Sequence, residues 1–176
     1  PGHTVTFTPN GNNDVTGHMD AEVFLKGTRH TLTKNVFVRT GYSFTGWNTS
    51  STGYGTSYAP GGTYTGNADL TLYAQWTPVT YTIRYDANGG SGAPGNQTKT
   101  HGVSLTLSST RPTRTGYNFT GWNTSAYGYG VSFDPGETYT GNADLTLYAQ
   151  WTPSSYTITF DGNGATGGST ASMSIQ

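Results

Sequence analysis

The sequence contains no cysteine and few charged residues, and both features limit what the protein can be. Without cysteine it can form no disulfide, no thiolate metal site and no thiol nucleophile. Charged residues make up 10% of the chain, against about a quarter in ordinary soluble domains. Lys and Arg number 8 and Asp and Glu number 9, so no basic excess attracts nucleic acid or anionic membrane.

Long apolar runs are also absent. No stretch approaches the roughly 18 residues of a membrane span, so we expect no membrane insertion by this segment. The N-terminal residues 1–3 are not a signal peptide, so we expect any export signal to lie outside these residues. Thr, Gly, Ser, Asn and Tyr are abundant instead, which favours strands and turns over helices. The composition is typical of a mainly β, exported protein.

An internal repeat with an offset of 75 residues dominates the sequence. Residues 41–50, GYSFTGWNTS, recur as GYNFTGWNTS at 116–125. Residues 63–78 recur without change at 138–153. A fixed repeat of this kind indicates tandem modules, each of which is one structural unit.

Each module opens with the same strand-like pattern. YTIRYDANG at residues 81–89 recurs as YTITFDGNG at 156–164, and a looser copy, TVTFTPNG, stands at 4–11. In the first of these the apolar and polar residues alternate, which predicts a strand with one buried face, and the Asn-Gly that follows predicts a turn.

The offsets divide the chain into three parts. We place module 1 at residues 1–78, module 2 at residues 79–153 and the truncated start of a third module at residues 154–176. The connectors at 77–80 and 152–155 have four residues each and include a proline. Such short connectors predict modules in series with little bending.

Within module 2 the pattern predicts about five short strands. Leu, Ala and Trp alternate with polar residues over 145–151, the clearest strand of the module. Gly121 interrupts the alternation before Trp122, which predicts a β-bulge that turns the tryptophan towards the core. Residues 103–110 fit either an extended segment or a single helical turn.

Three motifs each occur twice: Tyr-Thr-Ile-x-Tyr/Phe-Asp-x-Asn-Gly at residues 81–89 and 156–164, Arg-Thr-Gly-Tyr-x-Phe-x-Gly-Trp at 39–47 and 114–122, and Asp-Leu-Thr-Leu-Tyr-Ala-Gln-Trp at 69–76 and 144–151. Together they resemble the Listeria-Bacteroides repeat, the B-repeat type of internalin B and of many bacterial surface proteins. The resemblance implies tandem β-grasp, ubiquitin-like modules with little helix, on an extracellular protein of the bacterial cell surface or a secreted one. Module 1 departs from the pattern at Thr8 and Pro9.

No residue group points to catalysis, a metal or a cofactor, and we expect no enzyme. The four histidines do not recur at equivalent positions: His3, His18, His30 and His101. Residues 162–167 formally match the Gly-x-Gly-x-x-Gly pattern of nucleotide-binding loops, but no helix is expected after them to hold a phosphate. We interpret them as a hairpin turn.

The sequence favours neither of two covalent modifications. An internal Lys–Asn isopeptide crosslink would need a buried lysine in each module, but Lys26, Lys34 and Lys99 do not align at one core position. Four Asn-x-Ser/Thr sequons are interpreted as incidental in a bacterial protein: Asn48, Asn96, Asn118 and Asn123.

The large side chains divide into a core set and a contact set. Core packing is assigned to Trp47, Trp76, Trp122, Trp151, Phe44, Phe119, Leu70, Leu72, Leu145 and Leu147. Tyrosines outside the buried pattern are the candidate ligand contacts: Tyr54, Tyr127 and Tyr129 in Gly-rich loops, and Tyr73 and Tyr148 on the polar face of the last strand. Exposed tyrosines could stack on a sugar, dock a protein or cover a neighbouring module.

We therefore expect a structural spacer or stalk repeat with adhesive protein contacts. The alternative is a glycan- or receptor-binding module that uses the loop tyrosines. The partner would be a host protein, a neighbouring surface protein or a cell-surface glycan. The opening strand of the third module, residues 156–160, would be disordered, fold back on module 2 or pair with a strand of another chain.

Overall fold

The computed structural model describes residues 2–176, and these form strands, turns and loops without a helix. The mainly β prediction is confirmed. The chain divides into two compact units. Unit 1 comprises the described residues up to Thr80 together with Thr100–Gly102, and unit 2 comprises Tyr81–Lys99 and Val103–Gln176. The module boundaries at residues 78 and 153 stay predictions.

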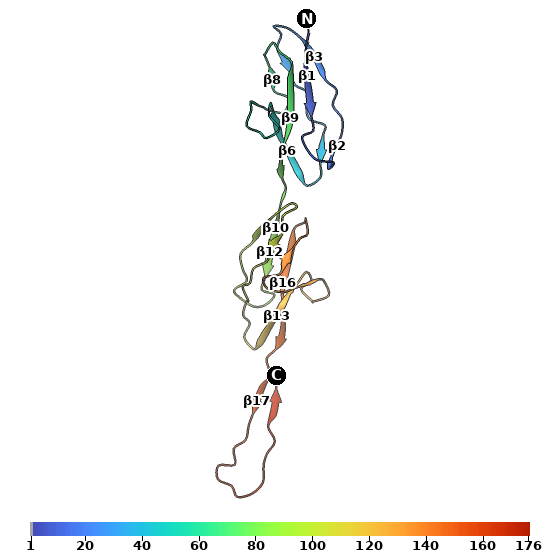
Figure 1. Cartoon of the computed structure of the whole chain (residues 1–176). Helices are drawn as coiled ribbons and strands as arrows, with labels where there is room; N and C mark the ends of the chain where they lie inside the picture. The colour runs from blue at the N-terminus through green and yellow to red at the C-terminus, as the bar shows by residue number, and fades with distance from the viewer. Residues whose placement is uncertain (1) are drawn as a thin grey trace. The chain divides into compact units, whose positions relative to one another are not determined.

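Each unit is built on a five-stranded mixed sheet (Figure 1). The first sheet has the order β3-β1-β9-β6-β7, with β1 (Gly2–Thr8), β3 (Glu22–Leu25), β6 (Tyr42–Asn48), β7 (Ser57–Tyr58) and β9 (Leu70–Pro78). The second has the order β11-β10-β16-β13-β14, with β10 (Thr80–Asp86), β11 (Gln97–Thr100), β13 (Tyr117–Asn123), β14 (Ser132–Phe133) and β16 (Leu145–Pro153). The two sheets therefore repeat one topology.

The opening and closing strands of each sheet are parallel neighbours. β1 pairs with β9 in a register that places Val5 opposite Leu70. β10 pairs with β16 in the same way, with Ile83 opposite Leu145. Every other strand pairing in the two sheets for which a register is given is antiparallel. The repeated motifs at the two ends of the module thus meet at the centre of its sheet.

Small two-stranded sheets supplement the main ones. They pair β2 (Val15–Thr16) with β5 (Val38–Arg39), β4 (His30–Thr31) with β8 (Thr63–Tyr64), and β12 (Leu105–Thr106) with β15 (Thr138–Tyr139). The prediction of about five strands in module 2 matches its main sheet and omits β15, and β12 lies in the segment that the sequence leaves open between an extended conformation and a helical turn. Residues 103–110 contain only β12 and no helix. The β-grasp topology implied by the resemblance stays a prediction.

The predicted bulge in β13 is confirmed. The pairing of β13 with β16 shifts register between Phe119 and Gly121, and Gly121 has a φ of 145°. This backbone conformation is one that residues with a Cβ atom rarely adopt. The bulge brings Trp122 into the core, where its side chain is fully buried.

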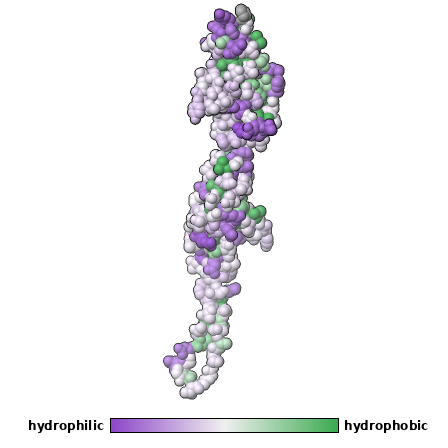
Figure 2. All heavy atoms as spheres, viewed as in Figure 1, coloured by the Kyte–Doolittle hydropathy of each residue, from purple (hydrophilic) through white to green (hydrophobic). Residues whose placement is uncertain are grey.

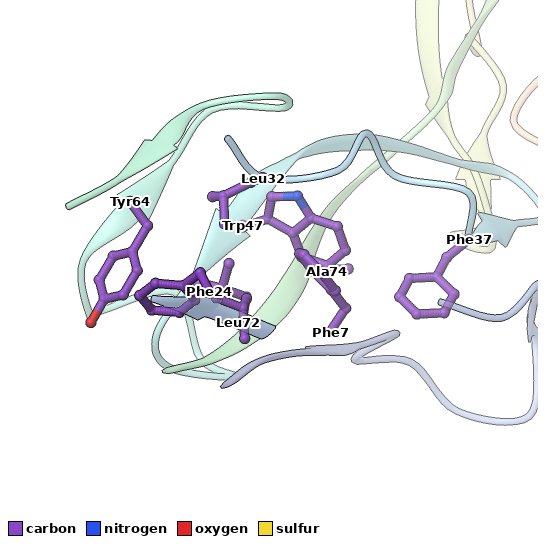
Figure 3. Packing of buried hydrophobic residues seen from close by; sticks show 9 residues of the cluster. Phe7, Phe24, Leu32, Phe37, Trp47, Tyr64, Leu72 and Ala74 are labelled. Atoms are coloured by element: carbon purple, nitrogen blue, oxygen red, sulfur yellow. The ribbon is translucent and has the colours of Figure 1, made fainter. Parts of the chain in front are cut away.

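Aromatic and aliphatic side chains fill the core of unit 1 (Figure 3). Phe7, Trp47 and Ala74 lie between Phe24 on one side and Phe37 on the other. Phe7 and Phe37 both contact the Trp47 ring, with ring centroids 4.9 and 6.1 Å apart. The equivalent cluster in unit 2 consists of Ile83, Leu107, Trp122, Leu147 and Ala149.

The residues assigned to the core from the sequence occupy two depths. Four of them are buried: Trp47, Trp122, Leu72 and Leu147. The other six are partly buried and pack against the same clusters: Phe44, Leu70, Trp76, Phe119, Leu145 and Trp151. Trp76 and Trp151 also donate their indole N–H groups to the carbonyl oxygens of Pro9 and Ala87, at 2.8 and 3.0 Å.

Lys99 occupies a core position. In both β3 and β11 the third residue is the buried one, Phe24 in the first and Lys99 in the second. Lys99 is 1% exposed, and its Nζ donates a hydrogen bond to Asn142 Oδ1 at 3.1 Å. A lysine stem can replace part of a phenylalanine ring in packing while the ammonium keeps a polar partner.

The segment after module 2 forms a hairpin. β17 (Tyr156–Ile158) pairs antiparallel with β18 (Met173–Ile175). The sequence leaves disorder, folding back on module 2 and pairing with another chain open for residues 156–160, and pairing with a later strand of the same segment is none of these. Pairing with a strand of another chain stays a prediction.

Candidate ligand-contact site

Two equivalent loops carry the tyrosines identified from the sequence. We call residues 49–56 and 124–131 the Gly-Tyr loops; the first joins β6 to β7 and the second joins β13 to β14 (Figure 1). Both connect antiparallel strands of a main sheet. Neither loop contains a charged residue.

A buried asparagine organises each loop. Asn48 Oδ1 accepts hydrogen bonds from the backbone N–H groups of Ser50 and Gly55 at 2.8 and 2.9 Å. Its Nδ2 donates to the carbonyl oxygens of Gly53 and Gly55 and to Ser57 Oγ, at 3.0–3.2 Å. Asn48 is 1% exposed. Its amide therefore fixes the path of the loop from inside it.

Asn123 makes the same five contacts in the second loop. It accepts from Ser125 N and Gly130 N and donates to Gly128 O, Gly130 O and Ser132 Oγ, at distances of 2.8–3.4 Å. It is also 1% exposed. The sequence interpretation missed this role of Asn48 and Asn123, although both stand in the Trp-Asn-Thr-Ser stretch that is unchanged between the copies.

Side chains from neighbouring strands brace the loops further. Gln75 Nε2 donates to Ser50 O at 3.2 Å, and Gln150 Nε2 donates to Ser125 O at 3.1 Å. Between the first and last residues of each loop, a threonine hydroxyl accepts a hydrogen bond from a backbone N–H, as in the 2.9 Å bond from Thr56 N to Thr49 Oγ1. The loops are ordered by polar contacts rather than by burial of apolar side chains.

The tyrosines at the loop tips face solvent. Tyr54, Tyr127 and Tyr129 are 94%, 84% and 92% exposed. Tyr127 and Tyr129 lie together in the second loop. Tyr73 and Tyr148 are half-buried on the closing strands, two residues before the glutamines that brace the loops. Rigid display of an exposed aromatic ring provides a stacking surface at little cost in conformational entropy.

A shallow hollow lies beside the first loop. It has a volume of about 390 Å³, and Gly53, Ser57 and Gln75 line it among other neutral residues. Figure 2 shows a visible surface of mostly intermediate hydropathy, on which the strongly apolar residues are scattered. The loops and the hollow therefore offer hydroxyl groups, amides and aromatic rings, but no charge.

The four sequons differ in accessibility. Asn96 and Asn118 are exposed, whereas Asn48 and Asn123 are buried with their amide nitrogens engaged in hydrogen bonds. A glycan attaches to that nitrogen, so the folded loops cannot carry one at Asn48 or Asn123.

The titratable side chains form pairs rather than clusters. His30 Nε2 lies 2.5 Å from Glu22 Oε2, and Arg39 Nε donates to Asp14 Oδ2 at 2.9 Å. Within residues 2–176, no group of three or more His, Cys, Asp or Glu side chains is placed to hold a metal ion. No helix in that part of the chain has the length and apolar character to cross a membrane.

Comparison with known proteins places these features in a family. The model of the Listeria-Bacteroides repeat domain matches residues 3–75 and again residues 81–150. A Listeria monocytogenes protein named "Internalin H" is 39% identical over 114 residues, which are 64% of this chain and 19% of that protein. No solved structure matches the chain.

Two proteins of Evansella cellulosilytica are also similar. The one named "Putative Gly-rich membrane protein" is 40% identical over 135 residues, 72% of this chain and 16% of its own length. The one named "Putative membrane protein" is 34% identical over 158 residues, 85% of this chain and 22% of its own length. The chain thus spans less than a quarter of the length of these relatives. Because the family model matches it twice in tandem, the chain belongs to the Listeria-Bacteroides repeat domain family.

Proposed function

We propose that this chain is a structural spacer segment of an exported bacterial surface protein, with adhesive protein contacts. The observation that carries the proposal is the repetition of one complete sheet topology in units 1 and 2. In each sheet the opening strand pairs with the closing strand of the same sheet. A module can therefore be added to a series without changing the others. The relationship to Internalin H and to two membrane-protein relatives supports a place at the cell surface.

The short connection between the sheets supports a spacer role as well. β9 ends at Pro78 and β10 begins at Thr80, so Val79 is the only residue between two strands. A connection of one residue has few backbone torsions to vary, whereas a flexible tether needs a long Gly- or Ser-rich segment.

Small-angle scattering tests the spacer proposal. A tandem fusion of two copies of residues 1–153 has four modules, and its maximum dimension should grow in proportion to the number of modules. In a matched variant with ten Gly and Ser residues inserted after Val79, the growth should shift towards the square root of module number. Growth with the square root of module number in the chain without the insertion would contradict the proposal, because freely jointed modules behave in that way.

The second candidate function is glycan or receptor binding through the Gly-Tyr loops. The nearly complete exposure of Tyr54 and Tyr129 on asparagine-braced loops favours it. Neutral hydroxyl groups and aromatic faces suit a sugar, which offers hydroxyl groups and apolar C–H faces but no charge. A protein partner would use the same rings as anchors.

Binding of the chain to a glycan array and to host surface proteins tests this second function. The triple variant Tyr54→Ala, Tyr127→Ala and Tyr129→Ala should abolish binding with little change in Tm, because the three rings are exposed. Val103→Ala, at another exposed apolar residue, is the control and should bind normally. Retention of binding by the triple variant, or no binding by the unaltered chain, would exclude the loops as a contact site.

A further inference from the structure

An arginine stacks on a tyrosine at the same place in both units. The guanidinium carbon of Arg39 lies 3.8 Å from the centre of the Tyr42 ring, and that of Arg114 lies 3.9 Å from the centre of the Tyr117 ring. Stacking on an aromatic face holds a guanidinium in place, while the N–H groups at its edge can still donate to a carboxylate. Both arginines are therefore positioned to bind an anion.

In unit 1 a carboxylate binds this arginine. Arg39 Nε donates to Asp14 Oδ2 at 2.9 Å. This hydrogen bond lowers the pKa of the Asp14 carboxyl below its ordinary value of 3.8. Asp14 is exposed and belongs to residues 11–15, which lead from Asn10 to Thr16. Unit 1 thus shows how a short polypeptide loop presents an aspartate to the stacked arginine.

The corresponding loop of unit 2 is shorter and contains no acidic residue. Asn10 and Asn88 hold equivalent positions, because each donates through Nδ2 to a carbonyl oxygen of the closing strand, at 2.8 and 2.9 Å. Thr16 and Ser91 are equivalent as well, because each pairs with the residue before the stacked arginine. Residues 11–15 separate the first asparagine from the threonine, whereas only two glycines separate the second asparagine from the serine. The loop of unit 2 therefore lacks a counterpart of the aspartate.

Arg114 consequently has no carboxylate partner in its own unit. Among residues 2–176, no Asp or Glu side chain forms an ion pair with it. Asp86, the nearest acidic residue in the sequence, accepts the N–H of Asn88 at 2.7 Å instead. A Cβ atom at Gly89 would lie 3.6 Å from Arg114 Cζ. The glycine therefore leaves space beside the guanidinium.

That space belongs to a hollow of about 650 Å³, which we call the Arg114 hollow. It is lined by Arg114 and Tyr117, by Gly89 and Gly90, and by three residues with hydroxyl groups, Ser91, Thr113 and Thr115. Arg114 is the charged residue of this lining. The hydroxyl groups can each donate and accept hydrogen bonds, as the amide groups of a peptide require.

The residues that form the hollow all belong to unit 2 and lie between positions 89 and 117. Unit 1 is followed along the chain by another repeat, and its Arg39 still holds a carboxylate. A repeat that follows therefore leaves room for a carboxylate at the stacked arginine.

A protein partner suits the hollow better than an acidic sugar. In unit 1 the group bound to the stacked arginine is an aspartate side chain. Sugar rings bind by stacking their apolar C–H faces on an aromatic ring. The face of Tyr117 next to the charge is covered by Arg114, so a sugar has no ring to stack on there.

We infer that the Arg114 hollow binds the side-chain carboxylate of an aspartate presented by an exposed loop of a partner protein. The guanidinium donates to this carboxylate as Arg39 donates to Asp14, and the hydroxyl groups of the hollow bond to the adjoining peptide groups. The inference specifies the chemistry of the adhesive protein contacts in the proposed function and rests on that part of it. Arg39 takes no part, because its own unit supplies the aspartate.

The probe is the peptide Gly-Asn-Asn-Asp-Val with blocked termini, which has the sequence of residues 11–15. It is added to the full 176-residue chain, and NMR follows the side-chain Nε–H signals of the arginines. The Arg114 signal should shift in a saturable manner with a dissociation constant in the millimolar range, because one exposed ion pair contributes little affinity. The Arg39 signal should not shift. The matched peptide Gly-Asn-Asn-Asn-Val should bind at least tenfold more weakly.

Three variants of the chain locate the binding. Arg114→Ala should abolish it, with the backbone signals of the rest of unit 2 unchanged. Arg114→Lys keeps the positive charge but loses the planar fork of the guanidinium, so it should weaken binding severalfold. Arg111→Ala, at an exposed arginine of the same segment, is the control and should bind normally.

Four results would overturn the inference. The first is no saturable shift of the Arg114 signal, the second is equal binding of the two peptides, and the third is equal binding by Arg114→Ala. The fourth is a shift of the Arg114 signal by methyl glucuronide at a tenfold lower concentration than the peptide needs, which would assign the hollow to an acidic glycan. None of these results alters the growth of the maximum dimension with module number, so the inference and the spacer proposal can fail separately.

Discussion

The side-chain amide of Asn123 forms two hydrogen bonds with the backbone of Gly130, accepting its N–H at 2.9 Å and donating to its carbonyl oxygen at 3.2 Å. Asn48 makes the same pair of bonds with Gly55 in unit 1. One buried side chain thus supplies the backbone of the loop with hydrogen bonds that strand pairing would otherwise provide. This relationship explains how a Gly-rich loop without a charged or large buried residue keeps one conformation.

Asn123→Ala should therefore destabilise unit 2. It leaves buried backbone groups of the loop without their partner, which should lower the free energy of unfolding by about 2–4 kcal/mol. Urea unfolding followed by tryptophan fluorescence measures the change. Asn118→Ala, at an exposed asparagine of the same strand, should change stability by less than about 0.5 kcal/mol. Equal effects of the two substitutions would contradict the structural role of Asn123.

Gly121→Ala tests the bulge that buries Trp122. The φ of 145° is unfavourable for alanine, and the added Cβ would lie 3.4 Å from Phe133 O. We expect a loss of about 1–3 kcal/mol in the free energy of unfolding. Gly95→Ala is the control, because a Cβ there meets nothing within 4 Å. A neutral Gly121→Ala would mean that the bulge can be rebuilt without a positive φ.

Lys99→Met tests the buried lysine. Methionine keeps most of the stem volume and removes a buried charge, so the free energy of unfolding should stay within about 1 kcal/mol of the original or rise. Lys99→Ala should instead lower it by about 2 kcal/mol or more, because it leaves a cavity where Phe24 stands in unit 1. Thermal and urea unfolding distinguish the two substitutions. Lys34→Met, at an exposed site, should have little effect.

The burial of Tyr85 predicts that the free energy of unfolding falls at alkaline pH. Burial raises the pKa of its hydroxyl above the ordinary value of 10.0, and the hydrogen bond from Ser108 N at 2.9 Å acts in the opposite direction. The folded state favours the neutral phenol, which donates to Gln97 Oε1 at 2.5 Å. Stability from this group is complete below pH 10 and is lost as the pH rises through the higher folded pKa.

Urea unfolding of the original chain and of Tyr85→Phe between pH 8 and pH 11 measures this effect. The variant should lose about 1 kcal/mol at pH 8, because one hydrogen bond is absent. Its stability should then fall less steeply with pH above 10. Parallel curves would show that Tyr85 ionises equally easily in the folded and unfolded chains. Unit 1 has Phe7 at the equivalent position and serves as an internal reference.

The sequence predicts the strands of the main sheet and the bulge at Gly121, because alternation and its interruption are local signals. It leaves residues 103–110, which contain β12, open between an extended segment and a helical turn, and it does not reveal β15. It also misses Asn48 and Asn123, because a buried asparagine in a Gly-rich loop looks like any other turn residue. The sequence does not reveal the burial of Lys99 either, since only the sheet order shows that this lysine occupies the position of Phe24.

The candidate site also has one feature that the sequence predicts and one that it does not. The exposure of Tyr54, Tyr127 and Tyr129 follows from their place outside the apolar alternation. The bracing of their loops by Gln75 and Gln150 depends on contacts between residues 25 positions apart, which no local pattern encodes.

The parallel pairing of β1 with β9 and of β10 with β16 has a mechanical consequence. Two parallel strands at the start and end of a module carry the incoming chain and the outgoing chain at opposite ends of the pair. A pulling force along the polypeptide therefore acts on the pair in shear and loads all of its hydrogen bonds together instead of opening them one after another. A module of this topology resists extension most strongly in the direction in which tension reaches it.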